Sequence, residues 1–166
     1  MLGVSYLAMS QYKVAAGPRP VALKAICPWE GFTDGFRDFL SPGGITERGL
    51  SRLWVALTKR FARIGIDIAK KRREHPLRDS WWNTITPDLA NITIPILVCA
   101  SFSDSNLHST GSMRAFTDVS SVERHVYTHR SPKWSTFYGE EARTYQWHFS
   151  IVISARCRPL PFLRYG

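Results

Sequence analysis

Cysteine is scarce in this sequence, and long apolar runs are missing. The cysteines Cys27, Cys99 and Cys157 are odd in number and widely spaced, so neither a disulfide framework nor a metal-ligand pattern is predicted. No stretch approaches the roughly 20 apolar residues of a membrane span, and the first residues lack the basic and apolar regions of a signal peptide. These absences favour a reduced, cytoplasmic protein with no metal, no cofactor and no membrane partner.

The composition is that of a folded protein rather than a disordered one. The chain has 166 residues, of which 44% are hydrophobic and 13% aromatic, enough for one domain with a buried core. A net charge of +9 would ordinarily suggest nucleic acid or an anionic membrane as a partner. The positive charge is concentrated at 59–73 and in the last eleven residues, and elsewhere it is interleaved with acidic residues. We interpret it mainly as the solvated face of a helix and expect no nucleic-acid partner.

Helix and strand patterns alternate along the chain. Apolar residues recur at helical spacing or lie between helix-ending signals in five stretches: Tyr6–Ala16, 46–71 with a break near Gly65, Arg78–Thr84, Ser109–Phe116 and Glu140–Gln146. Compact apolar or β-branched runs predict strands at Leu23–Cys27, Ile92–Ala100 and Arg124–His129. Ordered loops are predicted at Trp29–Gly44, 101–106 and Arg130–Trp134. Strands separated by helices imply an α/β protein with a mostly parallel sheet.

The segment Gly3-Val4-Ser5-Tyr6 is typical of the turn that carries the nucleophile of a serine hydrolase. In that turn the serine lies between a strand and a helix, and a small residue two positions earlier lets the backbone fold back without a clash. Taken alone, the tripeptide Gly3-Val4-Ser5 is also typical of a serine that caps the N-terminus of a helix.

Two further polar side chains follow later strands, and together with Ser5 they make a candidate catalytic set. Asp104 comes after the strand at Ile92–Ala100, and His129 closes the strand that starts at Arg124. The chain order serine, aspartate, histidine is that of α/β-hydrolases, in which such groups gather outside the carboxyl ends of the strands. His129 would take the proton of Ser5, Asp104 would hold the imidazole, and the backbone N–H of Tyr6 would donate to the oxyanion.

Alternatives to this assignment remain open on the sequence. Asp104 could equally cap a helix, and His129 competes as the base with His125 and His108.

The motif segment closely resembles the nucleophile segment of the cocaine-esterase and X-Pro dipeptidyl-peptidase (CocE/NonD) acyl hydrolases, in which a tyrosine follows the serine. Leu23–Pro28 with 34–44 resembles the strand and loop after the nucleophile helix, and 94–104 resembles the strand that carries the triad acid. Ala8 stands where the family usually has glycine. The resemblance covers about residues 1–146 and implies a partial α/β-hydrolase fold with an inserted helical cap.

The resemblance also implies a division of the chain and a function. The expected parts are a first core part at 1–45, a helical cap at 46–91, a second core part at 92–146 and an atypical basic tail at 147–166. The cap would form one wall of an acyl-binding pocket, and the tryptophans expected at the substrate are Trp29, Trp54, Trp81 and Trp82.

The implied activity is cleavage of a small-molecule ester or short peptide through an acyl-enzyme on Ser5, by an acyl esterase or an X-Pro dipeptidyl-peptidase-like enzyme. The family places strands before the serine and a further domain after the hydrolase domain, so this chain is expected to be truncated at both ends and weakly active or inactive by itself. The alternative is a non-catalytic hydrolase-like binding or regulatory protein.

Overall fold

A sheet of four parallel strands, in the order β1-β2-β3-β4, forms the centre of the molecule. The computed structural model describes residues 1–63, 65–104 and 107–157. The strands are β1 Leu2–Val4, β2 Cys27–Trp29, β3 Ile96–Ser101 and β4 Arg124–His129. The predicted parallel α/β architecture is confirmed, and β4 has the predicted bounds.

Strand β2 lies further along the chain than the sequence predicts. The expected strand at Leu23–Cys27 ended at Pro28, but Pro28 is the middle residue of β2. Trp29 pairs with Cys99 and Ile26 pairs with Ile96 on either side of it. A proline lacks the N–H that a ladder needs, so the two pairings flank Pro28, and the strand continues one residue past it. That extension brings the end of β2 to the same edge as the ends of β1 and β3.

Helices cover both faces of the sheet. They are α1 Tyr6–Ala16, α2 Leu50–Phe61, α3 Ile68–Glu74, α4 Ser80–Ile85, α5 Ser109–Asp118, α6 Lys133–Phe137 and α7 Glu140–Cys157. Short helical turns occupy Gly35–Leu40, Pro42–Gly44 and Leu89–Asn91. The helix at Tyr6–Ala16 and the break near Gly65 are confirmed, whereas α6 lies partly in a predicted loop and α7 continues well past Gln146. None of the helices in the described part of the chain has the length and apolar character needed to cross a membrane.

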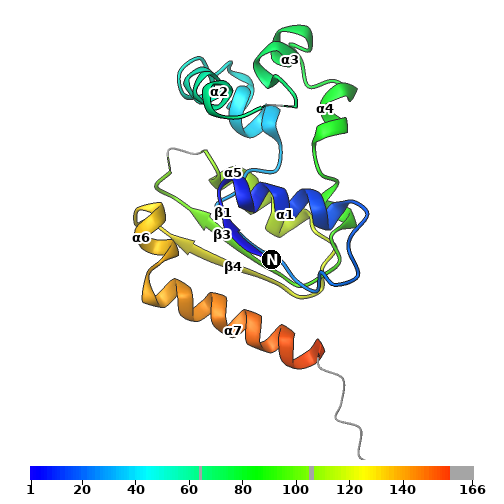
Figure 1. Ribbon diagram of the computed structural model, residues 1–166, viewed down its shortest axis with the longest axis vertical. Coiled ribbons are helices and arrows are strands. Elements are labelled where there is room, and N and C mark those ends of the chain that lie inside the picture. The colour runs from blue at the N-terminus through cyan, green and yellow to red at the C-terminus, as the bar shows by residue number, and fades with distance from the viewer. Residues whose placement is uncertain (64, 105–106, 158–166) are drawn as a thin grey trace, which may run out of the picture.

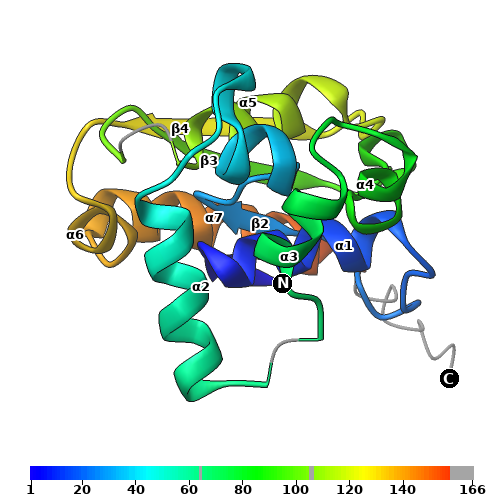
Figure 2. The ribbon, with the colours of Figure 1, turned by 90° about the horizontal axis from the view of Figure 1, so that it is seen from above.

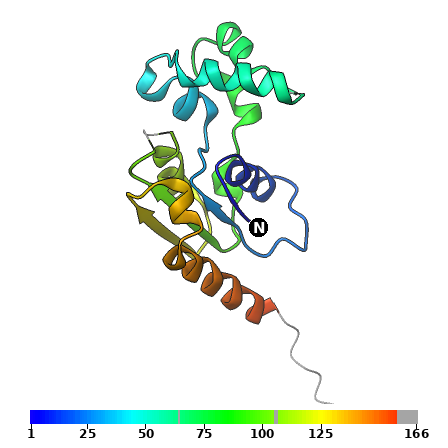
Figure 3. The same ribbon diagram turned by 60° about the vertical axis from the view of Figure 1, so that its left-hand side comes forward.

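The side chains of β3 alternate between two apolar cores, because successive residues of a strand point to opposite faces. Ile96 and Val98 belong to a core that also contains residues of α1 and α5, among them Tyr12 and Ala115. Leu97 and Cys99 belong to a second core on the other face, which is covered by α6 and α7. Figures 1 and 3 show α1 and α5 on one side of the sheet and α7 on the opposite side. All six residues of β3 are buried, which is typical of a strand covered on both faces.

Helices α2, α3 and α4 lie together above the rest of the molecule (Figure 1). A third apolar cluster joins α3 and α4 to the segment after β2, and its buried members are Phe36, Phe39, Leu40 and Trp82. Aspartates start two of these helices, since the side chain of Asp67 accepts from the N–H of Lys70 and that of Asp79 from the N–H of Trp81. Helix α2 projects outward (Figure 2).

Of the predicted segments, positions 105–106 of the loop after Ala100 and positions 158–166 of the tail lie outside the described residues. Residues 147–157 of the expected tail are part of α7.

Candidate active site

Ser5 lies on a tight turn between β1 and α1. Its φ of 57° and ψ of −115° belong to a region that non-glycine residues rarely adopt. Its backbone N–H donates to the carbonyl of Trp29 at 2.9 Å, which fixes the turn to the end of β2. A Cβ at Gly3 would lie 2.6 Å from the Cβ of Leu7. The chain therefore needs a glycine two positions before the serine, as the motif implies.

A second close approach explains the small residue at position 8. Ala8 is fully buried in α1, and a Cβ added to Gly31 would lie 2.7 Å from the Cβ of Ala8. Gly31 therefore provides the space that the methyl group of Ala8 takes. The exchange of glycine for alanine in the motif is accommodated by the loop that follows β2.

His108 connects the two predicted residues Ser5 and Asp104. Its Nε2 lies 3.4 Å from Ser5 Oγ, and its Nδ1 lies 2.6 Å from Asp104 Oδ2. His108 is 2% exposed, and its ring stacks on Phe32 with centroids 6.2 Å apart. Asp104 Oδ2 also accepts from the backbone N–H of His108 at 3.1 Å. A serine hydroxyl, an imidazole and a carboxylate thus lie next to one another, in that order, at the carboxyl edge of the sheet.

The carboxyl group of Asp104 is held in its charged form. Burial alone would raise its pKa, but the hydrogen bond with His108 and the positive charges of His108 and Lys133 outweigh burial, and the pKa lies below its usual value. The hydroxyl of Ser109 adds a hydrogen bond to Asp104 Oδ1 at 3.2 Å. An ionised Asp104 can accept a hydrogen bond from Nδ1–H of a neutral His108, which leaves Nε2 free to accept the proton of Ser5.

His129, the predicted base, has other partners in this structure. Its Nε2 lies 3.0 Å from Glu30 Oε1 and its Nδ1 lies 3.0 Å from the carbonyl oxygen of Ser131. His125, the second candidate, lies within β4, where its ring meets that of Phe149 in α7, on the face of the sheet opposite α1. Ser5 and Asp104 thus lie at one edge of the sheet, as predicted, and His108 rather than His129 is the histidine that contacts both.

The predicted oxyanion donor lies at the first position of α1. Tyr6 follows Ser5 directly, and the backbone N–H at the start of a helix has no carbonyl acceptor within that helix. The Tyr6 side chain is exposed. The N–H of Tyr6 therefore has no acceptor within α1.

Among the residues that the structure describes, two sets of side chains are close enough to share a metal ion: Glu30, Cys99 and His129, and Glu30, Asp104 and His108. Burial, followed by the charge of Glu30, raises the pKa of the Cys99 thiol, so that sulfur stays protonated and is a poor ligand. In the second set the ammonium of Lys133 already lies 3.0 Å from His108 Nδ1 and 3.5 Å from Glu30 Oε2. These side chains are therefore an acid–base network with its own cation rather than a set of metal ligands.

A largely apolar cavity of about 550 Å³ opens beside Ser5. The turn and α1 contribute Ser5 and Met9, the segment after β2 contributes Phe32 and Phe39, and α2 contributes Trp54. The cap therefore does form one wall of the cavity next to the serine.

The four predicted substrate tryptophans do not lie together. Trp54 lines the cavity, but Trp29 is buried on the other face of the sheet, with its ring 5.2 Å from that of Tyr127. Trp81 stacks on His75. Trp82 is 1% exposed and belongs to the apolar core of the cap. Of these four, Trp54 alone lines the cavity, because the others fill apolar cores or pack on the cap surface.

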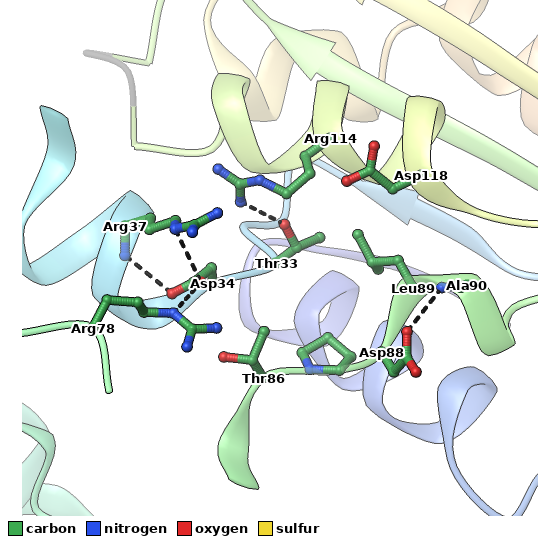
Figure 4. Close-up of a pocket in the computed structure, with 11 residues that line it drawn as sticks. Thr33, Asp34, Arg37, Arg78, Thr86, Asp88, Leu89, Ala90, Arg114 and Asp118 are labelled. Atoms are coloured by element: carbon green, nitrogen blue, oxygen red, sulfur yellow. Dashed lines mark hydrogen bonds and ion pairs between the residues drawn. The ribbon is translucent and has the colours of Figure 1, made fainter. Parts of the chain in front are cut away.

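A smaller cavity of about 320 Å³ lies where the cap joins the core (Figure 4). Its arginines face aspartates: Arg78 Nε lies 2.8 Å from Asp34 Oδ2, and Arg114 makes two bonds of 2.9 and 3.0 Å to the carboxylate of Asp38. Arg37 lies 3.9 Å from Asp34. The arginines around this cavity lie beside aspartates, so we interpret it as part of the joint between cap and core.

The positions of three residues in the site were not predicted from the sequence. Glu30 was placed in a loop because Pro28 seemed to end the strand; an acidic residue directly after a buried apolar run was the available signal. Lys133 comes from a loop with no motif, and its role depends on α6. His108 was an alternative candidate for the base. It lies just before α5 and not at the end of a strand, so the strand-end rule did not favour it.

One solved structure resembles this chain closely in both fold and sequence. No protein-family model matches the chain, and a comparison with curated proteins finds no relative. Among solved structures, a CocE/NonD family hydrolase from Staphylococcus aureus superposes with a TM-score of 0.81 and 37% identity over 89% of this chain. The chain belongs to the CocE/NonD hydrolases. It spans 27% of the length of that Staphylococcus aureus chain, about a quarter.

More distant structures share the fold of this CocE/NonD segment. The acylaminoacyl peptidase of Pyrococcus horikoshii matches 99% of the chain over 24% of its own length, with 16% identity and a TM-score of 0.56. The monoacylglycerol lipase of Paleococcus ferrophilus matches 92% over 67% of its own length, with 15% identity and a TM-score of 0.54. At these identities the likeness is one of fold alone. It agrees with the predicted partial α/β-hydrolase fold.

Proposed function

We propose that this chain carries the catalytic centre of a serine hydrolase that cleaves an ester or amide through an acyl-enzyme on Ser5. The observation that carries the proposal is the chain of contacts from Ser5 Oγ to His108 Nε2 at 3.4 Å and from His108 Nδ1 to Asp104 Oδ2 at 2.6 Å. The left-handed φ of Ser5 supports the same reading, because strain of this kind gathers where a nucleophile must be exposed.

The contacts of Ser5, His108 and Asp104 support one sequence of steps. Ser5 Oγ attacks the substrate carbonyl carbon while its proton passes to His108 Nε2, and the resulting oxyanion accepts from the N–H of Tyr6, an interaction worth roughly 3–4 kcal/mol in comparable sites. The carbonyl re-forms as the bond to the leaving group breaks, and the leaving group takes the proton from His108. Water then attacks the acyl-enzyme by the same route and frees Ser5. Asp104 holds the imidazole and stabilises its charged form throughout.

The assignment of the base departs from the sequence prediction. His108 is preferred because it contacts both Ser5 and Asp104, whereas His129 is occupied by Glu30. A base must lie within hydrogen-bond reach of the proton that it takes. His129 stays the alternative, and substitution of each histidine separates them.

The substrate is inferred from the cavity beside Ser5. Its walls are mostly apolar and its volume of about 550 Å³ suits a small ligand. We therefore infer an ester or amide with an apolar acyl or side-chain group. Acyl esters and short X-Pro peptides both meet that description.

The test of the proposal is reaction of the chain with a fluorophosphonate probe, in which Ser5 Oγ displaces fluoride from phosphorus. We expect labelling on the peptide that contains Ser5 and none in Ser5→Ala. His108→Gln should slow labelling by about 100-fold or more, as loss of a general base does, while His125→Gln serves as the matched control on the opposite face of the sheet.

Two results would overturn parts of the proposal. A weakly active chain should still be labelled slowly at Ser5, so a chain that is folded by circular dichroism and stays entirely unlabelled contradicts the catalytic function and favours a binding protein. Labelling that survives in His108→Gln but disappears in His129→Gln restores His129 as the base. Asp104→Asn is the second variant for the case in which His108→Gln fails to fold.

The cavity is tested with p-nitrophenyl esters of increasing acyl length. We expect Trp54→Ala to lower turnover of long acyl esters more than of acetate, because Trp54 lines the cavity. Trp81→Ala is the control, since Trp81 packs on His75 and Trp82 away from Ser5. Equal effects of the two variants across all chain lengths would contradict the assignment of this cavity to the substrate.

A further inference from the structure

Behind His108 lies a second group of charges that the proposed reaction does not use. Glu30 is fully buried at the end of β2, with a φ of 51°, and its backbone N–H donates to the carbonyl of Cys99 at 3.0 Å. A buried carboxylate is unfavourable unless it is paired. A non-glycine residue in this conformation also needs a surrounding structure that holds it there. Glu30 therefore has a specific task at this edge of the sheet.

The first partner of Glu30 is His129, whose two ring nitrogens both face acceptors. Nδ1 lies 3.0 Å from the carbonyl oxygen of Ser131, and Nε2 lies 3.0 Å from Glu30 Oε1. Thr136 Oγ1 also lies 3.2 Å from Nδ1, but its proton goes to the carbonyl of Pro132. Carbonyl and carboxylate oxygens only accept hydrogen bonds. Both ring nitrogens of His129 thus lie within hydrogen-bond distance of an acceptor, and Nε2 lies beside the carboxylate of Glu30.

The second partner of Glu30 is Lys133, at the start of α6. Glu30 Oε2 has no hydrogen-bond partner among the described residues, and the ammonium of Lys133 lies 3.5 Å away. The same ammonium lies 3.0 Å from His108 Nδ1. Lys133 is therefore shared between Glu30 and the imidazole that contacts Ser5.

This sharing sets up a competition for one nitrogen. His108 Nδ1 can donate a proton to Asp104 or accept one from Lys133, but it has a single in-plane position for either bond. If Nδ1 donates to Asp104, Nε2 is free to accept the proton of Ser5. If Nδ1 accepts from Lys133, the ring proton is on Nε2, and His108 cannot act as a base.

We propose that Glu30 and Lys133 are positioning residues that select the ring tautomer of His108, with Glu30 competing with Nδ1 for the ammonium of Lys133 so that Nδ1 stays bonded to Asp104. The inference rests on the proposed function only where it speaks of rate. The charged groups that face His108 in the described structure are Asp104 on its own loop, Lys133 on α6 and Glu30 directly after β2, with His129 behind Glu30.

The experiment uses Glu30→Gln, Lys133→Met and the double variant in the whole chain, with Lys70→Met as the control on an exposed helix face of the cap. The rate of fluorophosphonate labelling is measured from pH 5 to 9. Glu30→Gln should lower the plateau rate by about tenfold or more, as loss of an outer hydrogen-bond partner of a histidine does in other sites. The double variant should recover most of that loss, and Lys70→Met should match the unaltered chain.

The pH profiles give opposite signs for the two single variants. Lys133→Met removes a cation beside the ring, which favours the charged imidazole, so the acid limb of the profile should move up by about one pH unit. Glu30→Gln removes an anion, which disfavours the charged imidazole, so the limb should move down. A merely structural role would lower both rates without moving the limb, and that result would overturn the proposal.

Nitrogen NMR of the histidine rings tests the tautomer without any activity. The His108 signals are assigned by their loss in His108→Gln. We expect Nδ1–H in the unaltered chain and in Lys133→Met, and a shift towards Nε2–H in Glu30→Gln. The same tautomer in all three proteins contradicts the inference. If the unaltered chain is not labelled at all, the proposed function has failed, and these spectra alone decide the inference.

Discussion

The turn at Ser5 depends on a residue without a side chain, because β1 and α1 approach closely at Gly3. We predict that Gly3→Ala lowers the free energy of unfolding by about 1–3 kcal/mol, the usual cost of forcing extra atoms into a packed site, since the new Cβ would meet the Cβ of Leu7 at 2.6 Å. Urea denaturation followed by circular dichroism measures the change. Gly65→Ala is the control, because nothing lies within 4 Å of a Cβ there.

Asp104 makes stability depend on pH in a defined direction. Its pKa is lower in the folded chain than its usual value, so it stabilises the fold above the unfolded pKa of about 3.9 and loses that contribution as the pH falls through the lower folded value. We predict that Asp104→Asn is less stable than the unaltered chain at pH 7 and that the difference shrinks below about pH 4. Urea denaturation across this range checks it. A difference that grows on acidification would contradict the prediction.

Residue by residue, the sequence carries part of the site. Ser5 and Asp104 follow apolar strands with recognisable ends, so their arrival at one sheet edge could be predicted from the rule for parallel strands. The contact of His108 with both depends on the fold of the loop before α5, where no periodic pattern acts. The pairing of Glu30 with His129 depends on a strand that continues past Pro28, against the usual local preference.

At the scale of elements, the cap is tied to the core by an ion pair with little exposure. The carboxylate of Asp34 accepts from the N–H groups of Phe36 and Arg37 and from Arg78 Nε, 2.8 Å away. Asp34 is 3% exposed, so loss of its partner leaves a buried charge with fewer hydrogen bonds. The cap helices follow a local apolar periodicity, which is why their presence and the break near Gly65 could be predicted, whereas the caps at Asp67 and Asp79 are seen in the structure.

We predict that Arg78→Gln destabilises the chain by about 1–3 kcal/mol, the cost of an unmet buried charge, and speeds proteolytic cleavage within 46–91. Arg37→Gln is the matched control: the Arg37 side chain is 60% exposed and lies 3.9 Å from Asp34, so its loss should change stability by less than about 0.5 kcal/mol. Urea denaturation and limited trypsin digestion measure both variants. Equal effects of the two substitutions would show that the ion pair does not anchor the cap.

For the molecule as a whole, stability should decrease from the sheet to the cap. Strand β3 is buried along its length and pairs with β2 and β4, and apolar cores lie on both its faces. In α2 the buried residues are Ser51 and Val55, and Leu53, Leu57 and Phe61 are exposed. Segments with few buried apolar contacts open at lower free energy than the core.

Hydrogen exchange measured by mass spectrometry tests this order. We predict the slowest amide exchange in β3, intermediate exchange in β4, which within the described residues pairs with β3 alone, and the fastest exchange in α2. An apolar inhibitor bound at Ser5 should slow exchange in α2 most, because Trp54 and Val55 line the same cavity as Ser5, while β3 should hardly change. Exchange in α2 as slow as in β3 would contradict the separation of cap and core, and an unaltered α2 in the inhibited protein would contradict its part in the substrate cavity.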